Sequence, residues 1–431
     1  VIRDAQGNAA VHPANGFFRD NSQSYWSSGI HGANAALGGA AGELTDPANR
    51  TVYSNLTIDS GALGEELADL KVAANLALAN QLLLGVVSPV PVPGRPPVTD
   101  LVDWAYGYDI LDANGNGAVN DARADMGDPL HSRPATVIYA GPENDPDITL
   151  YATTNDGYLH AIDARTGAEL WSFVPRQMLR RIEPLYEDND VPSRVYGLDG
   201  AVKIVRLDRN NNGVIEPDGT DLDVPTNGIQ EDEKDKVYLF FGMRRGGSHY
   251  FAIDVTDPDD PRLMWRAGEP DAWLSSGADQ HLPGIGQSWS TPTAVRVNVA
   301  DHSWGDNADK LVLIVGGGYS TTQDAVTYTA DSVGNRIFML DALTGELLWR
   351  AGPSTDTGAQ LQLAKMSNAI PGEVRAIDLT GDGYADRFYA ADLGGRIWRF
   401  DINNGQVPSS LVSGGVFAPL GLRDAASTTA S

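Results

Sequence analysis

Oxygen-bearing side chains alternate along the segment 378–386, which reads DLTGDGYAD. In a calcium loop, side chains at positions 1, 3, 5 and 9 and the backbone carbonyl at position 7 converge on one cation, and a glycine at position 6 permits a sharp turn. Here Gly383 stands at position 6, and Tyr389 replaces the bidentate Glu that an EF-hand has at position 12. The candidate ligands of this shortened loop are Asp378, Thr380, Asp382, Tyr384 and Asp386.

The alternative reading of this segment is an acidic surface turn without metal. Three carboxylates within nine residues repel one another unless a cation neutralises them. The segment therefore predicts a Ca²⁺ site. Alternating strand sequence follows it, so we expect the loop to lie at a sheet edge between two strands.

Two further segments repeat the spacing with amides in place of most carboxylates. One has the candidate ligands Asp208, Asn210, Asn212, Val214 and Glu216, and the other has Asp112, Asn114, Asn116, Ala118 and Asn120, followed by Asp121. Asn-Gly turns without metal are the alternative, because these residues dominate turns. Ligand charge is a main determinant of calcium affinity, so the loop at Asp208 ranks above the loop at Asp112.

Catalytic chemistry has little support in the sequence. His131 stands beside Ser132, but no second triad partner can be assigned, which favours a structural histidine. The seven histidines form no zinc motif, and the chain has no cysteine. The glycines of 316–318 lack the Lys-Ser/Thr of a phosphate loop. We therefore expect a protein that is not an enzyme.

Charge limits the class of partner. With 31 basic and 57 acidic residues among 431, the formal net charge is −26. Such a balance disfavours nucleic acid and anionic membranes and suits divalent cations. Because of this charge, we expect the chain to stay monomeric at low salt. It begins at Val1 rather than Met, so we expect a fragment or a processed chain. The apolar region 63–87 carries charges and predicts an amphipathic core helix, too polar to span a bilayer.

The texture of the chain changes near residue 100. Residues 1–100 predict an N-terminal segment of irregular structure and short helices, which ends in a linker (88–98) with five prolines. Residues 101–431 read as short strands and turns, an all-β domain.

A repeated hairpin defines the architecture of this domain. Tyr158–Trp171 (YLHAIDARTGAELW) and Arg336–Trp349 (RIFMLDALTGELLW) share Asp, Ala, Thr, Gly, Leu and Trp at equal spacing, and partial copies occur at 249–265 and 396–405. The shared Asp recurs after 91, 87 and 60 residues. Propeller blades recur every ~40–50 residues, so the first two intervals hold about two blades each and the third holds one blade with an insertion. The spacing predicts a modified β-propeller of about six or seven blades, with the calcium loops as insertions.

Five motifs in order then give a family resemblance: MGDPLHSRP, NDGYLHAIDARTGAELW, SWSTPTAV, VGGGYS with RIFMLDALTGELLW, and DLTGDGYADRFYAADLGGRIWRFDI. Together they resemble the C-terminal domain of PilY-type type IV pilus tip proteins, over about 101–405. HGANAALGGAAGEL and RTVYSN resemble the segment just before that domain.

The resemblance implies a cell-surface protein of the pilus tip that passes the periplasm and outer membrane in transit. It implies Ca²⁺ as cofactor, and roles in pilus biogenesis, extension and retraction, twitching motility and adhesion. The implied partners are minor pilins and a host or abiotic surface. The family's calcium loop matches Asp378, Asp382, Tyr384 and Asp386, while Thr380 departs from its usual Asp or Asn; a second family site matches the Asp208 loop.

Two other classes of propeller share parts of this pattern. Quinoprotein dehydrogenases, which bind pyrroloquinoline quinone and calcium, contain similar hairpins, but only two hairpins here keep the full pattern and vicinal cysteines are missing. A scaffold propeller of the outer-membrane assembly type would need no calcium.

Overall fold

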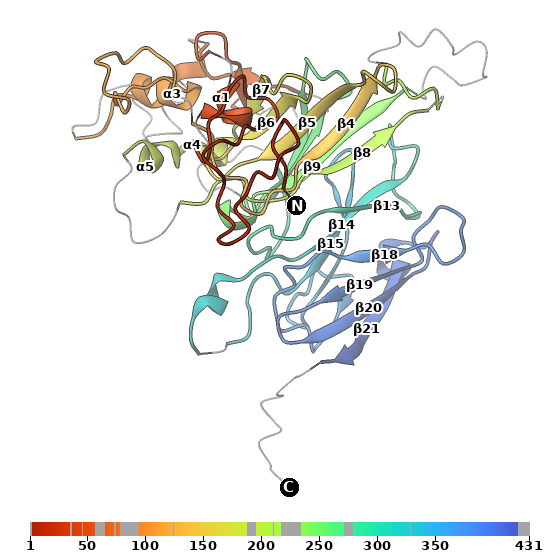
Figure 1. The fold of residues 1–431 in the computed structure, drawn as a ribbon. Helices are drawn as coiled ribbons and strands as arrows, with labels where there is room; N and C mark the ends of the chain where they lie inside the picture. The colour runs from red at the N-terminus through yellow and green to blue at the C-terminus, as the bar shows by residue number, and fades with distance from the viewer. Residues whose placement is uncertain are drawn as a thin grey trace.

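Four β-sheets follow one another along the chain, from the orange and yellow first sheet to the blue fourth sheet in Figure 1. The computed structural model describes residues 2–34, 37–44, 46–56, 65–72, 75–77, 94–123, 125–187, 195–209, 211–216, 234–270, 279–327 and 329–420. This mostly β architecture confirms the predicted fold class.

The first sheet has the strand order β3-β1-β7-β6-β5-β4, and the second has β12-β11-β10-β9-β8, with β2 also paired to β11. The strands of the first are β1 (Val52–Ser54), β3 (Ala68–Asp69), β4 (Ala135–Ala140), β5 (Asp147–Thr153), β6 (Leu159–Asp163) and β7 (Glu169–Phe173). Those of the second are β2 (Glu65–Glu66), β8 (Lys203–Leu207), β9 (Lys236–Gly242), β10 (Tyr250–Asp254), β11 (Arg262–Gly268) and β12 (Asp279–His281).

The third sheet has the order β13-β14-β15-β16-β17 and the fourth β18-β19-β20-β21. Their strands are β13 (Thr293–Arg296), β14 (Leu311–Gly316), β15 (Ile337–Asp341), β16 (Leu347–Gly352), β17 (Leu361–Gln362), β18 (Arg375–Ile377), β19 (Arg387–Ala391), β20 (Arg396–Ile402) and β21 (Val412–Pro419). The helices are short: α1 (Gly39–Gly42), α3 (Val98–Tyr106), α4 (Arg176–Leu179), α5 (Ile182–Glu187), α7 (Pro408–Leu411), and the 3₁₀ turns η2 (Arg244–Gly246) and η3 (Thr321–Asp324).

The repeated hairpin forms the last two strands of the antiparallel meander in each of the first three sheets. In the first sheet, Asp163 Oδ1 accepts the backbone N–H groups of Arg165 and Thr166, both at 2.8 Å, and Gly167 closes the turn at φ +80°. Asp341 does the same in the third sheet with the N–H groups of Leu343 and Thr344. The shared Asp therefore holds the turn, which confirms the hairpin predicted from the repeat.

The tryptophans of the first two hairpins contact the turn of the following sheet. Trp171 Nε1 donates to the carbonyl of Pro258 in the second sheet at 2.7 Å, and Trp265 Nε1 donates to Ala342 in the third at 2.8 Å. The Trp265 ring lies so close to Gly345 that a Cβ there would meet it at 2.7 Å. The repeat residues Trp and Gly thus form one joint between consecutive sheets.

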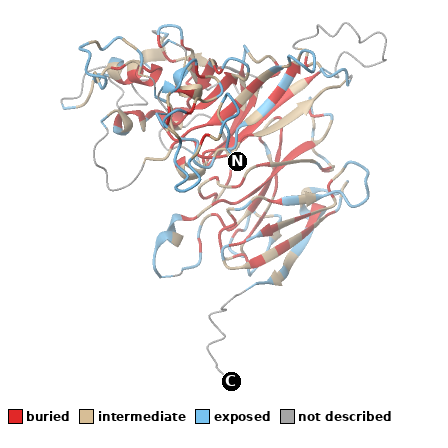
Figure 2. Ribbon diagram, in the orientation of Figure 1, coloured by how far each residue is buried: buried red, intermediate tan, exposed pale blue. Residues whose placement is uncertain are grey.

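Three hydrophobic clusters fill the molecule between successive sheets. One lies between the N-terminal segment, the first sheet and the second; another joins the second and third; the last joins the third and fourth. The central strand β15 is buried on both faces, whereas β20 alternates between buried and partly exposed residues. Figure 2 shows this as continuous red in the central strands and a mixture of colours in the fourth sheet.

Two predictions about helices were wrong in part. Over 65–72 the predicted helix is replaced by β2 and β3, which pair with β11 and β1. Leu67 and Leu70 are buried by this pairing, so sheet contacts outweigh the helical spacing there. Residues 75–77 are helical, as predicted, and most of the rest of the span 63–87 lies outside the described residues. Conversely α3 continues to Tyr106, beyond the predicted change to strands at 101, and ends at Gly107 with φ +98°.

The described residues form four sheets, against six or seven blades predicted from the spacing. In the part of the chain that the structure describes, no helix has the length and apolarity that crossing a membrane requires.

Replacing Trp265 by Phe removes the hydrogen bond to Ala342 while keeping most of the ring contact. We expect a loss of about 1–2 kcal/mol in the free energy of unfolding, because the buried carbonyl of Ala342 loses its donor. Urea unfolding measures it, with Trp304→Phe as control, since the Trp304 indole N–H bonds to none of the described residues. Equal midpoints for the two variants would contradict the role of the joint.

Candidate metal centre

The three predicted calcium loops occupy connections between elements. The loop at Asp378 joins β18 to β19 at a sheet edge, as predicted. The loop at Asp208 directly follows β8, and the loop at Asp112 lies between α3 and β4. None of them is part of a strand, so their sequences can vary without altering the sheets.

One hydrogen bond is common to all three loops. The carboxylate of the Asp at position 1 accepts the backbone N–H of the Gly at position 6, which has φ of +87°, +87° and +81° respectively. The distances are 2.8 Å from Gly383 N to Asp378, 3.0 Å from Gly213 N to Asp208 and 3.0 Å from Gly117 N to Asp112.

A second hydrogen bond also recurs, from the N–H at position 7 to the side-chain oxygen at position 5. It measures 2.9 Å from Tyr384 N to Asp382, 2.7 Å from Val214 N to Asn212 and 2.7 Å from Ala118 N to Asn116. Position 4 is left-handed each time, at Gly381, Asn211 and Gly115. The three segments therefore share one backbone conformation, which draws alternate side chains to the same side of the loop.

Side chains at positions 1, 3 and 9 meet in the loop at Asp378. The Thr380 hydroxyl lies 3.2 Å from Asp386 Oδ2 and 3.4 Å from Asp378 Oδ1, between the two carboxylates. The N–H groups of Leu379 and Thr380 also reach Asp386 Oδ2, which leaves the other oxygen of Asp386 outside these bonds. The N–H of Gly383 holds the pKa of Asp378 below its usual value, so this carboxylate is ionised at neutral pH.

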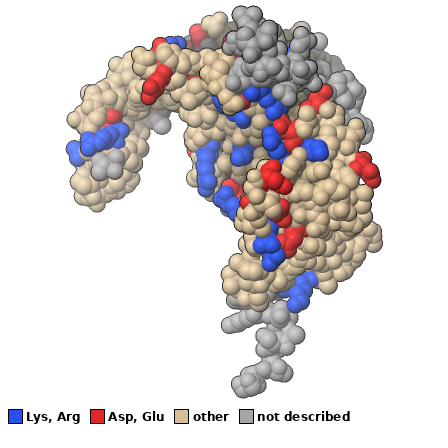
Figure 3. Space-filling view, turned by 90° about the vertical axis from the view of Figure 1, so that its right-hand side faces the viewer, with Lys and Arg blue, Asp and Glu red and all other residues tan. Residues whose placement is uncertain are grey.

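The negative charge of the carboxylates in the loop 378–386 is not balanced by basic side chains of the described residues. Elsewhere arginines neutralise carboxylates: Asp309 contacts Arg209 and Arg296, and the bond from Arg209 lowers the pKa of Asp309. Figure 3 shows Lys and Arg next to Asp and Glu down one face of the molecule. Among the described residues, by contrast, no Lys, Arg or His forms an ion pair with a carboxylate of the loop 378–386.

The loop at Asp208 is partly neutralised. Arg206 Nη1 lies 3.2 Å from Asp208 Oδ2, and its Nη2 donates to the Gly213 carbonyl at 2.9 Å. The other carboxylate oxygen, Asp208 Oδ1, is buried without a hydrogen-bond partner, as a ligand oxygen facing a cation would be. Asn212 Nδ2 donates to Glu216 at 3.0 Å, which brings positions 5 and 9 together. Asn210 lies outside the described residues.

In the loop at Asp112, the side chain that contacts the amides of Asn114 and Asn116 is the carboxylate of Asp121. The Asn120 side chain has no carboxylate to offer. Asp121 Oδ2 accepts the amide N–H groups of Asn114 at 2.8 Å and Asn116 at 2.7 Å, and these two bonds lower the pKa of Asp121. Asp121 Oδ1 is buried without a partner. Asp121, which follows position 9, could have been chosen from the sequence by its charge. The spacing of the calcium loop had selected Asn120 at position 9 instead.

A further carboxylate supports the loop at Asp208 from far along the chain. Asp235, which is buried just before β9, accepts the backbone N–H of Arg209 at 2.7 Å and that of Glu216 at 3.3 Å. No local pattern could reveal this residue, because only the pairing of β8 with β9 brings it to the loop.

The donor sets fit calcium better than zinc. No group of three or more His, Cys, Asp and Glu side chains capable of holding a metal occurs in the described ranges. A cation at these loops would thus need hydroxyl, amide and carbonyl oxygens beside the carboxylates, and Ca²⁺ takes six to eight oxygen ligands of such mixed kinds.

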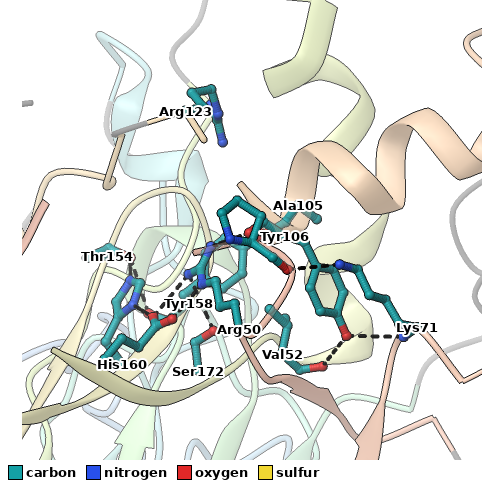
Figure 4. Close-up of polar contacts among 12 residues, drawn as sticks. Arg50, Val52, Lys71, Ala105, Tyr106, Arg123, Thr154, Tyr158, His160 and Ser172 are labelled. Carbon is teal, nitrogen blue, oxygen red and sulfur yellow. Dashed lines mark hydrogen bonds and ion pairs between the residues drawn. The ribbon is translucent and has the colours of Figure 1, made fainter. Parts of the chain in front are cut away.

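A second polar cluster lies beneath the N-terminal segment (Figure 4). His160 Nδ1 is 2.6 Å from Glu169 Oε1, and His160 Nε2 is 3.0 Å from the Thr154 hydroxyl. Arg50, from the N-terminal segment, bonds both oxygens of Glu169, at 2.5 and 3.0 Å. The order hydroxyl, imidazole, carboxylate is that of a catalytic triad. However, all four side chains are buried, and Arg50 neutralises the carboxylate, so the cluster anchors the segment to the first sheet.

His131, next to Ser132, finds its carboxylate partner at a distance in the sequence. Its Nδ1 lies 2.9 Å from both oxygens of the buried Asp199, which also binds Arg244. Ser132 instead bonds Thr153. The two neighbours therefore turn to different partners.

Comparison with known proteins decides the family. The family profile of the PilY1 beta-propeller domain matches residues 120–414, more than half of the chain. The chain belongs to the PilY1 β-propeller family. This confirms the family resemblance given by the five motifs and the propeller fold predicted from the repeated hairpin.

PilY1 relatives have modest identity to this chain. A type IV pilus biogenesis factor PilY1 homologue of Xylella fastidiosa is 26% identical over 255 residues, which are 59% of this chain and 16% of that protein. PilY1 of Pseudomonas aeruginosa is 27% identical over 258 residues, 60% of this chain and 17% of that protein. The chain thus spans about a sixth of the length of these PilY1 proteins.

Among solved structures, the C-terminal domain of Pseudomonas aeruginosa PilY1 is similar over 59% of this chain and 38% of that chain, with 23% identity and a TM-score of 0.36.

Replacing Glu169 by Gln tests the anchor beneath the N-terminal segment. Burial alone would raise the pKa of Glu169, but the Arg50 charge and the His160 hydrogen bond lower it to about 2. A carboxyl with a lower pKa in the folded chain stabilises the fold above the unfolded value of 4.5 and loses that contribution as the pH falls towards 2. The variant should lose about 3–5 kcal/mol at pH 7, because Arg50 stays buried without a counter-charge.

Urea unfolding at several pH values measures this effect, and Glu346→Gln, at an exposed turn position, is the control. If the variant and the wild type lost stability equally between pH 4.5 and pH 2, Glu169 would not be the group that titrates there.

Proposed function

We propose that this chain is a calcium-binding β-propeller of a type IV pilus-associated protein. In this role it acts in pilus biogenesis, in control of extension and retraction, in twitching motility and in surface adhesion. Family membership supports the pilus role. The observation that carries the calcium proposal is the loop conformation shared by three segments of different sequence.

The loop at Asp378 is the proposed principal site. Asp378, Thr380, Asp382 and Asp386 would supply side-chain oxygens and Tyr384 its carbonyl. The loop is preorganised, because backbone N–H groups already orient Asp378 and Asp386, and no basic side chain in the described residues competes for them. At the Asp208 loop, Arg206 occupies one carboxylate oxygen, so we expect weaker binding there.

Binding at these loops would stabilise the fold and tie together strands that the insertions separate. A cation that binds only the folded form stabilises by RT ln(1 + [L]/Kd), about 2.7 kcal/mol at a hundredfold excess over Kd. At Asp378 this stabilisation would act on the β18–β19 hairpin of the fourth sheet. The proposed effect of calcium on pilus function would act through the order of this sheet.

The proposed site on the pilus is its tip, at the cell surface, with minor pilins and a host or abiotic surface as partners. Pull-down of pilins by the intact protein, with and without calcium, tests this part. Recovery of the same pilins with an Asp386→Ala protein in calcium would separate pilin binding from the metal.

We do not propose a quinone enzyme. Trp289 is a partly exposed tryptophan of the kind on which a planar cofactor could stack, but the Tyr319 ring stacks on it with centroids 4.3 Å apart. The guanidinium groups of Arg244 and Arg245 also lie against its ring.

The decisive experiment is a calorimetric calcium titration of the wild type and of Asp386→Ala. Asp386→Ala should bind one calcium fewer, and its melting temperature should fall most of the way to that of the chelated wild type. Asp208→Ala should have a smaller effect, and Asp306→Ala, an exposed Asp outside the loops, should have none. An Asp386→Ala protein that bound the same number of ions with unchanged affinity would place the site elsewhere.

A further inference from the structure

Two consecutive arginines and three aromatic rings gather where the first three sheets meet. Arg244 and Arg245 form the turn between β9 and β10, Tyr196 precedes β8, and Trp289 precedes β13. Tyr319 follows β14, and its backbone pairs with that of Gln287. None of these residues belongs to the calcium loops.

The rings and guanidinium groups form a layered stack. Tyr319 and Trp289 are parallel within 18°, with ring centroids 4.3 Å apart. Arg244 Cζ lies 4.5 Å and Arg245 Cζ 4.9 Å from the Trp289 ring centroid, and Arg245 Cζ is 5.1 Å from that of Tyr196. Arg245 thus lies against two aromatic rings, which fix the plane of its guanidinium group.

The two arginines differ in their counter-charges. Arg244 Nη1 bonds the buried Asp199 at 3.0 Å, so its charge is balanced. Arg245 has no carboxylate and no hydrogen-bond acceptor among the described residues, and its Nε is buried without a partner. Within the described residues, the guanidinium of Arg245 therefore keeps an unbalanced positive charge in a chain with a net charge of −26.

The turn is held rigidly in this arrangement. Arg244 adopts φ +50°, a left-handed conformation that costs a non-glycine residue free energy and persists only where packing enforces it. Gly246 packs so tightly that a Cβ would lie 1.9 Å from the Gly197 carbonyl oxygen. Arg181 donates to the carbonyls of Tyr196 and Gly246, at 3.0 and 2.9 Å, and so links both sides of the stack.

We propose that Arg245 binds a carboxylate group of a ligand. A guanidinium held flat against aromatic rings presents its N–H donors in its own plane, in the fork that matches a carboxylate. Asp324, which accepts the Tyr319 hydroxyl at 2.6 Å, places a negative charge beside the stack, which repels a phosphate dianion about twice as strongly as a carboxylate monoanion. Stacking of a ligand ring on Trp289 is not part of the proposal, because Tyr319 and the guanidinium groups already lie against it.

The carboxylate has two possible sources: a free organic acid, or an acidic side chain of a partner peptide. Titration with sodium acetate and with the blocked peptide acetyl-Gly-Glu-Gly-amide distinguishes them, and acetyl-Gly-Gln-Gly-amide is the uncharged control. The readout is the NMR shift of the arginine Nε–H and tryptophan indole N–H resonances at low chloride. Tighter binding of the Glu peptide than of acetate indicates a peptide source, and equal binding indicates a free acid.

Arg245→Gln should weaken carboxylate binding at least about tenfold, the effect of losing a charge-assisted hydrogen-bond pair. Arg399→Gln is the matched control, because Arg399 is partly exposed and paired with Asp401 at 3.0 Å; it should bind as the wild type does. If Arg245→Gln does not fold, Arg245→Lys carries the test, since its ammonium keeps the charge but lacks the planar fork.

No saturable shift with either carboxylate, or equal affinity in the wild type and the Arg245 variant, would overturn the proposal. Calcium binding is measured on the same proteins and should be unchanged by Arg245→Gln, so failure of this proposal and failure of the calcium proposal give different results.

Discussion

The contact between a tryptophan of one sheet and the turn of the next is the interaction on which the rest of the structure depends. Each such indole buries a large apolar surface, and its N–H finds a carbonyl in the neighbouring sheet, so it is both hydrophobic contact and directional bond. The shared Asp keeps the turn in the shape that the ring requires. Beside the hydrophobic clusters between the sheets, this joint adds a directional bond that fixes how one sheet faces the next.

The contact between tryptophan and turn is also informative at the two ends of the row of sheets, at the N-terminal segment and at the fourth sheet. Trp26, from the N-terminal segment, donates to the Ala164 carbonyl of the first sheet at 2.9 Å and lies against Gly167, as a preceding sheet would. In the fourth sheet the return strand β21 has Gly415 opposite Arg399, where the earlier sheets have tryptophan. Trp349 meets this sheet through Phe388 and Phe400, and its Nε1 is buried without an acceptor.

The sheets form the stable framework, and the oxygen-rich loops lie in the connections between elements. Because hydrophobic clusters between sheets hold the framework, connections can take up oxygen-rich loops without disturbing the packing. The electrostatic environment of each loop then differs. Asp208 has Arg206 beside it, whereas the carboxylates of 378–386 face solvent without a basic neighbour in the described residues. A bound cation would therefore change the net charge of the loop 378–386 most.

The sequence by itself determined what is local. The repeat of Asp, Gly and Trp predicted the hairpins, and oxygen ligands at alternate positions with Gly383 at position 6 predicted a turn between strands, because both depend on backbone conformation within a few residues. Only the tertiary structure decided which distant residues meet. Leu67 and Leu70 have helical spacing, yet the residues beside them form strands that pair with β1 and β11. Three side chains bond partners that are distant in the sequence: Asp235 with Arg209, Asp199 with His131, and Arg50 with Glu169. Burial and ion pairing reward contacts regardless of separation along the chain, so a local pattern could not foresee them.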